Sequence, residues 1–197
     1  KSWVGAWLAS FAALNGKDDP ELLKAQKLLA TWDWTSDGKG AADSFAERVI
    51  RLGARRNWRG ETMPDPRQTL REAVDEFQER FGRIDPPLGD IQRLRRGNAD
   101  MAMLGGTDTL RATTMWDAEQ PDKKVRVRHG DSFIMLIRWD KDGTLTSESI
   151  QPYGAATTRP NSPHYTDQME LFAAGKYKPV HFEWADAIKA SKRRYRP

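Results

Sequence analysis

The stretch FIMLIRWDKDGTLTSESI, residues 133–150, contains two runs of β-branched and aromatic residues separated by Asp142-Gly143. An Asp-Gly pair between two such runs is typical of a β-hairpin. The sequence therefore predicts strands over residues 133–139 and 145–150, and a similar run predicts a further strand over residues 125–127. We expect these strands to be antiparallel.

Toward the N-terminus, strand patterns give way to helix patterns. The clearest helix is predicted to start at Asp65-Pro66 and to stop at Gly82. Proline suits the first turn of a helix, and glycine suits the position just after the last turn. The apolar stripe of this helix consists of Leu70, Ala73, Val74, Phe77 and Phe81.

Other segments of the first half also have helical spacing. Asp19-Pro20 predicts a second helix start, and a further helix is predicted around residues 45–52. Residues 3–14 place apolar side chains on one broad face, which favours a buried helix over the hydrophobic core of a signal peptide. The stretch is too short to span a bilayer, which needs about 20 residues.

The C-terminal third is expected to return to helices. Ser162-Pro163 predicts the cap of a helix that runs from His164 toward Ala174 and stops at Gly175, and a short terminal helix is predicted over residues 184–192. A helical block followed by paired strands indicates an α+β fold. We divide the chain into a helical segment, residues 1–87, and a segment of strands and helices, residues 88–197.

The composition is that of a globular protein. The chain has 197 residues and a mean hydropathy of −0.77, with 38% hydrophobic and 30% charged residues. These values argue against a membrane protein and against wholesale disorder. Cysteine is absent, which excludes disulfides, cysteine-ligated metal sites and thiol nucleophiles.

Positive charge is concentrated in two places. Lysine and arginine number 32 against 28 acidic residues, and much of the excess lies in an arginine run and a basic tail, namely Arg48, Arg51, Arg55, Arg56, Arg59, Lys189, Lys192, Arg193, Arg194 and Arg196. No recognisable nucleic-acid reading element accompanies them, so a solvated surface is favoured. The alternative is a non-catalytic domain that binds a polyanion or glycan through the basic tail and aromatic residues. The eight tryptophans fall mostly on apolar stripes, and we expect them in the core.

The three histidines, His129, His164 and His181, are too widely spaced for a short zinc motif. His164 and Asp167 are spaced i, i+3 on the predicted helix. Such a pair suits an acid/base couple, two metal ligands or a structural contact at a helix start, and the structural interpretation is favoured because the first turn stabilises an acidic residue.

Two further strings resemble catalytic or phosphate-binding motifs. Residues 129–132, His-Gly-Asp-Ser, contain the residue types of a hydrolytic triad, but Asp131 and Ser132 are neighbours and would point to opposite faces of a strand. We therefore interpret them as a strand entry. Gly105-Gly106 lacks the lysine of a phosphate loop and predicts a tight turn or a close backbone approach.

Three segments carry a resemblance to a known family. They are LRRGNADMAMLGGTDTLRA (residues 94–112), HGDSFIMLIRW (residues 129–139) and QPYGAATTRPNSPHYTDQMELFAAGKYKPVHF (residues 151–182). From about residue 88 onward, the chain resembles the C-terminal part of the β-subunit of the penicillin acylase family, in the branch of acyl-homoserine-lactone and lipopeptide acylases. The most specific motif is Ser-Pro-His-Tyr-x-Asp-Gln, residues 162–168.

The resemblance implies an N-terminal-nucleophile hydrolase with a four-layer αββα core, cut from a secreted precursor into α and β chains. In that family the first residue of the β-chain, a serine, attacks an amide carbonyl with its own α-amino group as the base. A backbone amide and an asparagine side chain stabilise the oxyanion. These groups lie upstream of the matched region, so the resemblance places no catalytic, cofactor-binding or metal-ligating residue in this chain. Ser2 would become terminal only if Lys1 were removed, and we do not assign it as the nucleophile.

The same resemblance implies a structural signature, Asp131, Ser132, His164, Tyr165, Asp167 and Gln168. Asp131 and Ser132 would enter a core strand, and the other four would anchor the last helix to the sheets.

The resemblance also implies partners, because strands that complete sheets begun elsewhere leave edges and apolar faces uncovered. The chain begins with Lys1 rather than methionine, and we expect a piece of a longer protein. Its partners would be the α-subunit and the N-terminal part of the β-subunit, and the chain alone would be inactive. The complete enzyme would be periplasmic or secreted, with any calcium outside this chain, and would cleave acyl-homoserine lactones, lipopeptides or β-lactams.

Overall fold

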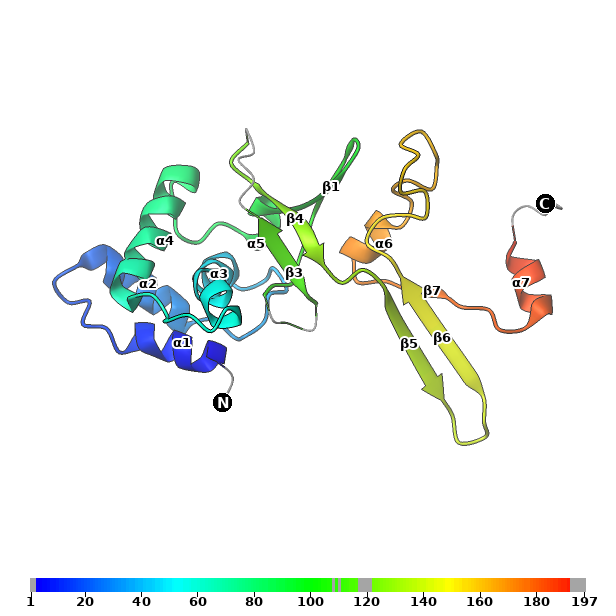
Figure 1. The fold of residues 1–197 in the computed structure, drawn as a ribbon, viewed down its shortest axis with the longest axis horizontal. Coiled ribbons are helices and arrows are strands. Elements are labelled where there is room, and N and C mark those ends of the chain that lie inside the picture. The colour runs from blue at the N-terminus through cyan, green and yellow to red at the C-terminus, as the bar shows by residue number, and fades with distance from the viewer. Residues whose placement is uncertain (1–2, 108, 110, 117–121, 192–197) are drawn as a thin grey trace. The chain divides into compact units, whose positions relative to one another are not determined.

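A computed structural model describes residues 3–107, 109, 111–116 and 122–191 (Figure 1). The chain forms two compact units, Lys1–Gly130 and Asp131–Pro197, which we call the first and second unit. The predicted division at residues 87 and 88 separates helix-rich from strand-rich sequence, and it stays a prediction.

The first unit begins with four helices, α1 (Trp3–Ala12), α2 (Pro20–Ala30), α3 (Asp43–Trp58) and α4 (Pro66–Phe81), followed by the single turn α5 (Leu88–Ile91). The predicted helices of the first half are thus confirmed. In the described parts of the chain, no helix combines the length and the apolar character that a membrane crossing requires.

The helix ends follow the predicted capping rules. The Asp19 side chain accepts the N–H of Leu22 at 3.2 Å, and the Asp65 side chain accepts the N–H of Gln68 at 2.8 Å. Gly82 ends α4 in the left-handed conformation at φ 69°, which glycine adopts without steric cost.

The core of the first unit lies between these helices. Phe45 contacts Phe77 edge to face, with ring centroids 5.3 Å apart, and Trp7 contacts Phe11 in the same way at 4.6 Å. The indole N–H of Trp7 donates to the Val49 carbonyl at 2.8 Å. The main cluster of buried side chains comprises Trp7, Phe11, Leu22, Ala25, Phe45, Val49, Leu70, Ala73, Val74, Phe77, Ile84 and Ile91.

A four-stranded sheet completes the first unit. Its strands are β1 (Gln92–Arg96), β2 (Ala99–Ala102), β3 (Thr113–Trp116) and β4 (Val125–Gly130), in the order β2-β1-β4-β3. The strand predicted at residues 125–127 is confirmed as β4, but the expectation that all pairs are antiparallel is wrong. Strands β1 and β4 are parallel, because the long connection through β2 and β3 returns the chain to the same end of the sheet.

The hairpin of β1 and β2 was not among the predicted strands. These strands pair antiparallel, with Arg96 opposite Ala99, and Gly97 turns between them at φ 58°. Charged residues dominate β1, so the apolar alternation that indicates a strand is weak there.

The second unit contains a three-stranded sheet and two short helices. Strands β5 (Ile134–Trp139), β6 (Leu145–Ile150) and β7 (Lys178–Pro179) lie in that order, all antiparallel, with helices α6 (Met169–Ala173) and α7 (Trp184–Ala190). The predicted hairpin is confirmed in the register Trp139 opposite Leu145. The α+β fold class is likewise confirmed.

The turn of this hairpin uses the predicted Asp-Gly pair. The Asp142 side chain accepts the N–H of Thr144 at 2.9 Å, and Gly143 has φ 85°. The Asp140 N–H donates to the Thr144 carbonyl at 2.9 Å and closes the loop.

The helix predicted to run from His164 is shorter than expected, since α6 begins only at Met169. The backbone before it is paired elsewhere. The His164 carbonyl accepts the N–H of Ala156 at 3.0 Å, and the N–H of Gln168 donates to the Tyr153 carbonyl at 2.8 Å. Because these groups are used by residues 153–156, an i to i+4 ladder cannot form across residues 164–168.

The tryptophans do not all lie in the core, so that expectation is partly wrong. Trp7 and Trp32 are buried, and Trp34 stacks on Trp32 with centroids 5.5 Å apart while remaining largely exposed. Among the tryptophans whose side chains are described, four are more than half exposed, namely Trp34, Trp58, Trp139 and Trp184. The side chain of Trp116 lies outside the described set.

Candidate functional site

The Ser-Pro-His-Tyr-x-Asp-Gln motif lies in the connection from β6 to α6, residues 151–168, which we call the signature loop. His164 Nδ1 and Asp167 Oδ2 are 2.8 Å apart, and the His164 N–H donates to Ser162 Oγ at 3.2 Å. The His164 side chain is 68% exposed and the Asp167 side chain 38%. The pair therefore sits in a surface turn and not in the first turn of a helix as predicted.

Gln168 closes the signature loop. Its N–H donates to the Tyr153 carbonyl at 2.8 Å, and its Oε1 accepts the N–H of Gln151 at 3.3 Å. Gly154 lies so close to the His164 carbonyl and the Asp167 carboxylate that a side chain there would overlap both. The motif thus holds the chain leaving β6 against the start of α6.

The other predicted signature residues are less tightly grouped. Tyr165 is half-buried, and its N–H donates to the Ser162 carbonyl at 3.0 Å. Asp131 and Ser132 precede β5; Ser132 is exposed, whereas Asp131 Oδ2 is buried with no hydrogen-bond partner in the described structure. The structure brings His164, Tyr165, Asp167 and Gln168 into one loop, and the structural role of all six residues stays a prediction.

The histidines do not gather. His129 is on β4 in the first unit, His164 is in the signature loop, and His181 follows β7. Within the described ranges, no group of three or more histidine and acidic side chains is placed to hold a metal ion. Ser2 lies outside the described residues.

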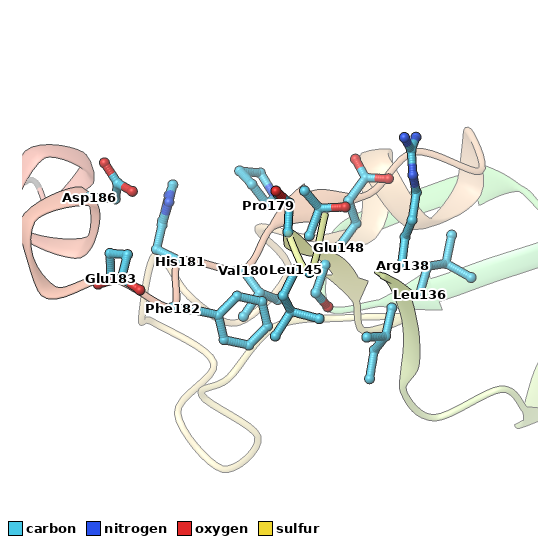
Figure 2. Close-up of a pocket in the computed structure, with 15 residues that line it drawn as sticks. Leu136, Arg138, Leu145, Glu148, Pro179, Val180, His181, Phe182, Glu183 and Asp186 are labelled. Carbon is cyan, nitrogen blue, oxygen red and sulfur yellow. The ribbon is translucent and has the colours of Figure 1, made fainter. Parts of the chain in front are cut away.

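The second unit carries an open groove of about 910 Å³ beside the β5–β6 hairpin and the segment after β7 (Figure 2). Leu145, Val180 and Phe182 form its apolar part. Charged side chains of both signs also line it, including Arg138 and Asp186.

The first unit also buries a cluster of polar side chains that was not predicted from the sequence. We call Ser36, Asp43, Glu47 and Thr107 the carboxyl cluster; all four are buried, and Glu47 is 0% exposed. The Ser36 hydroxyl is 2.5 Å from Glu47 Oε1, and the Thr107 N–H donates to Glu47 Oε2 at 2.9 Å. One carboxyl group thereby joins α3 to two loops.

The double-glycine turn, residues 105–107, makes this arrangement possible. Gly106 packs so closely on the Glu47 carboxyl that a side chain would overlap it. Gly105 has φ 90°, and its N–H donates to the Ser36 carbonyl at 2.8 Å. Of the two predicted alternatives at Gly105-Gly106, a tight turn or a close backbone approach, the close backbone approach is confirmed.

Burial governs the electrostatics of the cluster. It raises the pKa of Glu47 to about 7, against the opposing effect of the hydrogen bonds from Ser36 and Thr107. The nearby Asp43 raises the pKa of Glu47 further, whereas Arg51 lowers it. Burial also raises the pKa of Asp43, whose Oδ2 accepts the N–H groups of Gly38 and Gly40.

One sequence signal could have revealed the cluster. Asp43 and Glu47 are spaced i, i+4 and share a helix face with Ile50 and Ala54, which are both buried. Carboxyl groups on an apolar stripe predict buried acids.

The arginine run is relevant to the alternative function, a domain that binds a polyanion. Arg48 pairs with Glu76 at 2.5 Å, and Arg56 and Arg59 approach Glu61 at 3.6 and 3.7 Å. These contacts reduce the positive charge available to a polyanion. The basic tail beyond residue 191 lies outside the described residues, so binding through it stays a prediction.

A comparison with known families agrees with the sequence motifs. The model of the penicillin amidase family matches residues 4–189, a range that includes the helices of the first unit as well as the signature loop. The match therefore extends the resemblance to the helical part of the chain. This chain belongs to the penicillin amidase family, whose members are hydrolases of the N-terminal-nucleophile type.

Proposed function

We propose that this chain is the C-terminal portion of an acylase β-subunit, in the branch that cleaves acyl amides of homoserine lactones and lipopeptides. The nucleophile is an N-terminal serine encoded upstream of this chain. The chain completes the αββα core and supports the active site, and it is inactive alone. Acyl-homoserine lactones rank ahead of β-lactams as substrates because of the branch resemblance.

The observation that carries this proposal is the exposure of β5. Leu136 is 49% exposed, Ile137 45% and Trp139 68%. Neighbouring residues of a strand point to opposite faces, so apolar side chains are uncovered on both faces of this strand.

A strand that is apolar on both faces is typical of a sheet enclosed between two layers. The second unit supplies few covering elements of its own, since α7 has no buried residue and β7 has only two residues. The remaining parts of an αββα enzyme would supply the missing layers and a neighbouring strand.

The chemistry of the proposed enzyme needs no side chain from the second unit. The upstream serine hydroxyl attacks the acyl carbonyl, and its α-amino group accepts the hydroxyl proton and passes it to the leaving amine. Backbone and asparagine N–H groups stabilise the oxyanion. Water then releases the acyl group from the serine.

Activity of the complete enzyme tests the reaction. Replacing the N-terminal serine of the β-chain with alanine should abolish release of homoserine lactone from an acyl-homoserine lactone. Unchanged turnover in the alanine variant would refute the mechanism. A parallel assay with a β-lactam ranks the two substrate classes.

Assembly tests the role of this chain. In the complete enzyme, Ile137→Asp should reduce the yield of assembled subunits in size-exclusion chromatography, since it places a charge in an enclosed sheet. Lys141→Asp, in the exposed hairpin loop, is the matched control and should assemble normally. Equal assembly of both variants would contradict the proposal, as would a 197-residue chain that is monomeric and cooperatively folded throughout.

The proposal extends to location and cofactor. We place the enzyme in the periplasm or outside the cell, and any calcium ion in parts of the enzyme other than this chain. Cell fractionation and metal analysis of the complete enzyme test these two statements.

A further inference from the structure

Glu47 joins three segments that are distant in sequence. It lies on α3, its Oε1 contacts the hydroxyl of Ser36 eleven residues earlier, and its Oε2 accepts the N–H of Thr107 sixty residues later. The two loops also contact each other, because the Gly105 N–H donates to the Ser36 carbonyl. The carboxyl group is therefore the point where both loops attach to the helix.

The protonated carboxyl satisfies all of these partners. In the structure the Ser36 hydroxyl donates to Oε1 and the Thr107 N–H donates to Oε2. When Oε1 is protonated, its O–H donates to Ser36 Oγ instead, and Oε2 still accepts the N–H of Thr107. The ionised carboxylate accepts from both groups as well, but it places a negative charge in a site that excludes water.

The described charged groups around the carboxylate are of both signs. On α3, Asp43 is a second buried acid and Arg51 is the nearby cation. On the loop of Ser36, Asp37 pairs with Lys39 at the surface. On the third segment Arg111 packs its side chain on Gly105, and from β1 the neutral Gln92 amide donates to the Gly105 carbonyl at 3.0 Å.

We propose that Glu47 is a proton-controlled clasp, which holds the double-glycine turn on α3 when it is protonated and loosens the turn when it is ionised. The inference rests on the first unit alone and does not depend on the proposed acylase activity.

The direction of the pH effect follows from burial. The pKa of Glu47 is raised to about 7 in the closed clasp, whereas an opened, hydrated Glu47 has its ordinary value near 4.5. A raised pKa in the closed state means that the clasp is fully stable at acidic pH and loses stability as the pH rises to about 7. Above that pH both states are ionised, and the loss levels off.

Hydrogen exchange of the whole chain tests the clasp. The protection factor of the Thr107 amide, corrected for the intrinsic effect of pH, should fall on the order of 50-fold between pH 5 and pH 8. Amides of Val74 and Phe77 in α4 provide the internal control and should change far less. Constant protection at Thr107, or an equal fall in α4, would overturn the proposal.

Two variants locate the effect. Glu47→Gln keeps both hydrogen bonds without ionising, so protection of Thr107 at pH 8 should remain close to its value at pH 5. Glu76→Gln, which removes a carboxyl group that pairs with Arg48 and Arg80, should keep the fall seen in the unsubstituted chain. An undiminished fall in folded Glu47→Gln would refute the clasp. If Glu47→Gln does not fold, the unsubstituted chain and its α4 control decide the question.

Discussion

The two units of this chain bury their apolar residues to very different extents. In the first unit Phe45, Leu70 and Phe77 lie in a core that the helices close among themselves. In the second unit most apolar residues of β5 remain exposed, although their sequence is as hydrophobic as that of a core strand. The comparison shows that local patterning decides which element forms, whereas burial depends on layers that the element itself does not contain.

We expect the largest loss of stability from a substitution in the core of the first unit. Phe45→Ala should lower the free energy of unfolding by about 3–5 kcal/mol, because it removes a fully buried ring in contact with Phe77. Urea unfolding followed by far-UV circular dichroism reports on α1 to α4.

The matched control is Phe133→Ala in the second unit, where the ring is exposed. This substitution should change the free energy of unfolding by no more than about 0.5 kcal/mol. Equal losses in the free energy of unfolding for the two substitutions would contradict the difference in burial between the units.

A smaller effect is expected at the double-glycine turn. Gly106→Ala should destabilise the first unit by about 2–3 kcal/mol, because the new methyl group overlaps the Glu47 carboxyl. In a double-mutant cycle, Glu47→Ala makes room for that methyl group, so the double variant should cost less than the sum of the two single variants. Additive costs in urea unfolding would contradict the packing of Gly106 on Glu47.

Removal of a helix cap should lower the stability by a still smaller amount. Asp65→Ala should cost about 1 kcal/mol, because the N–H of Gln68 loses its side-chain acceptor. Asp75→Ala, at an exposed position within α4, is the control and should change stability by less than about 0.5 kcal/mol. Thermal unfolding compares the two, and a larger loss in Asp75→Ala would contradict the capping role.

The smallest effect is expected in the signature loop. Asp167→Ala removes the exposed contact with His164 and should change stability by less than about 1 kcal/mol. Hydrogen exchange at Ala156, whose N–H bonds the His164 carbonyl, measures the loop directly. Complete loss of protection there would show that this contact, and not Gln168, holds the loop closed.

Most of the local structure could be predicted from short-range rules. Asp19, Asp65 and Gly82 mark helix ends because their side chains or conformations satisfy the backbone at those points. Asp142-Gly143 marks the hairpin because glycine adopts the positive φ of the turn.

One failure is local, because the charged strand β1 lacks the apolar alternation that would indicate the β1–β2 hairpin. The other failures involve partners outside the predicted element. Helix α6 begins late because residues 153–156 use the backbone groups of its predicted first turn. The parallel pairing of β1 with β4 and the contact of Glu47 with Thr107 are likewise set by the tertiary fold. For the candidate site, the motif residues were identified, but the buried acids were not, although Asp43 and Glu47 share a helix face with buried apolar residues.

The closure of the signature loop by Gln168 has a practical consequence. Both ends of the loop are tied together, while its tip, residues 157–161, is exposed. Because the tip contributes little to that closure, a short epitope or a fluorophore attached there should leave the fold undisturbed. The tip therefore offers a labelling position from which binding of the proposed partner chains can be tested.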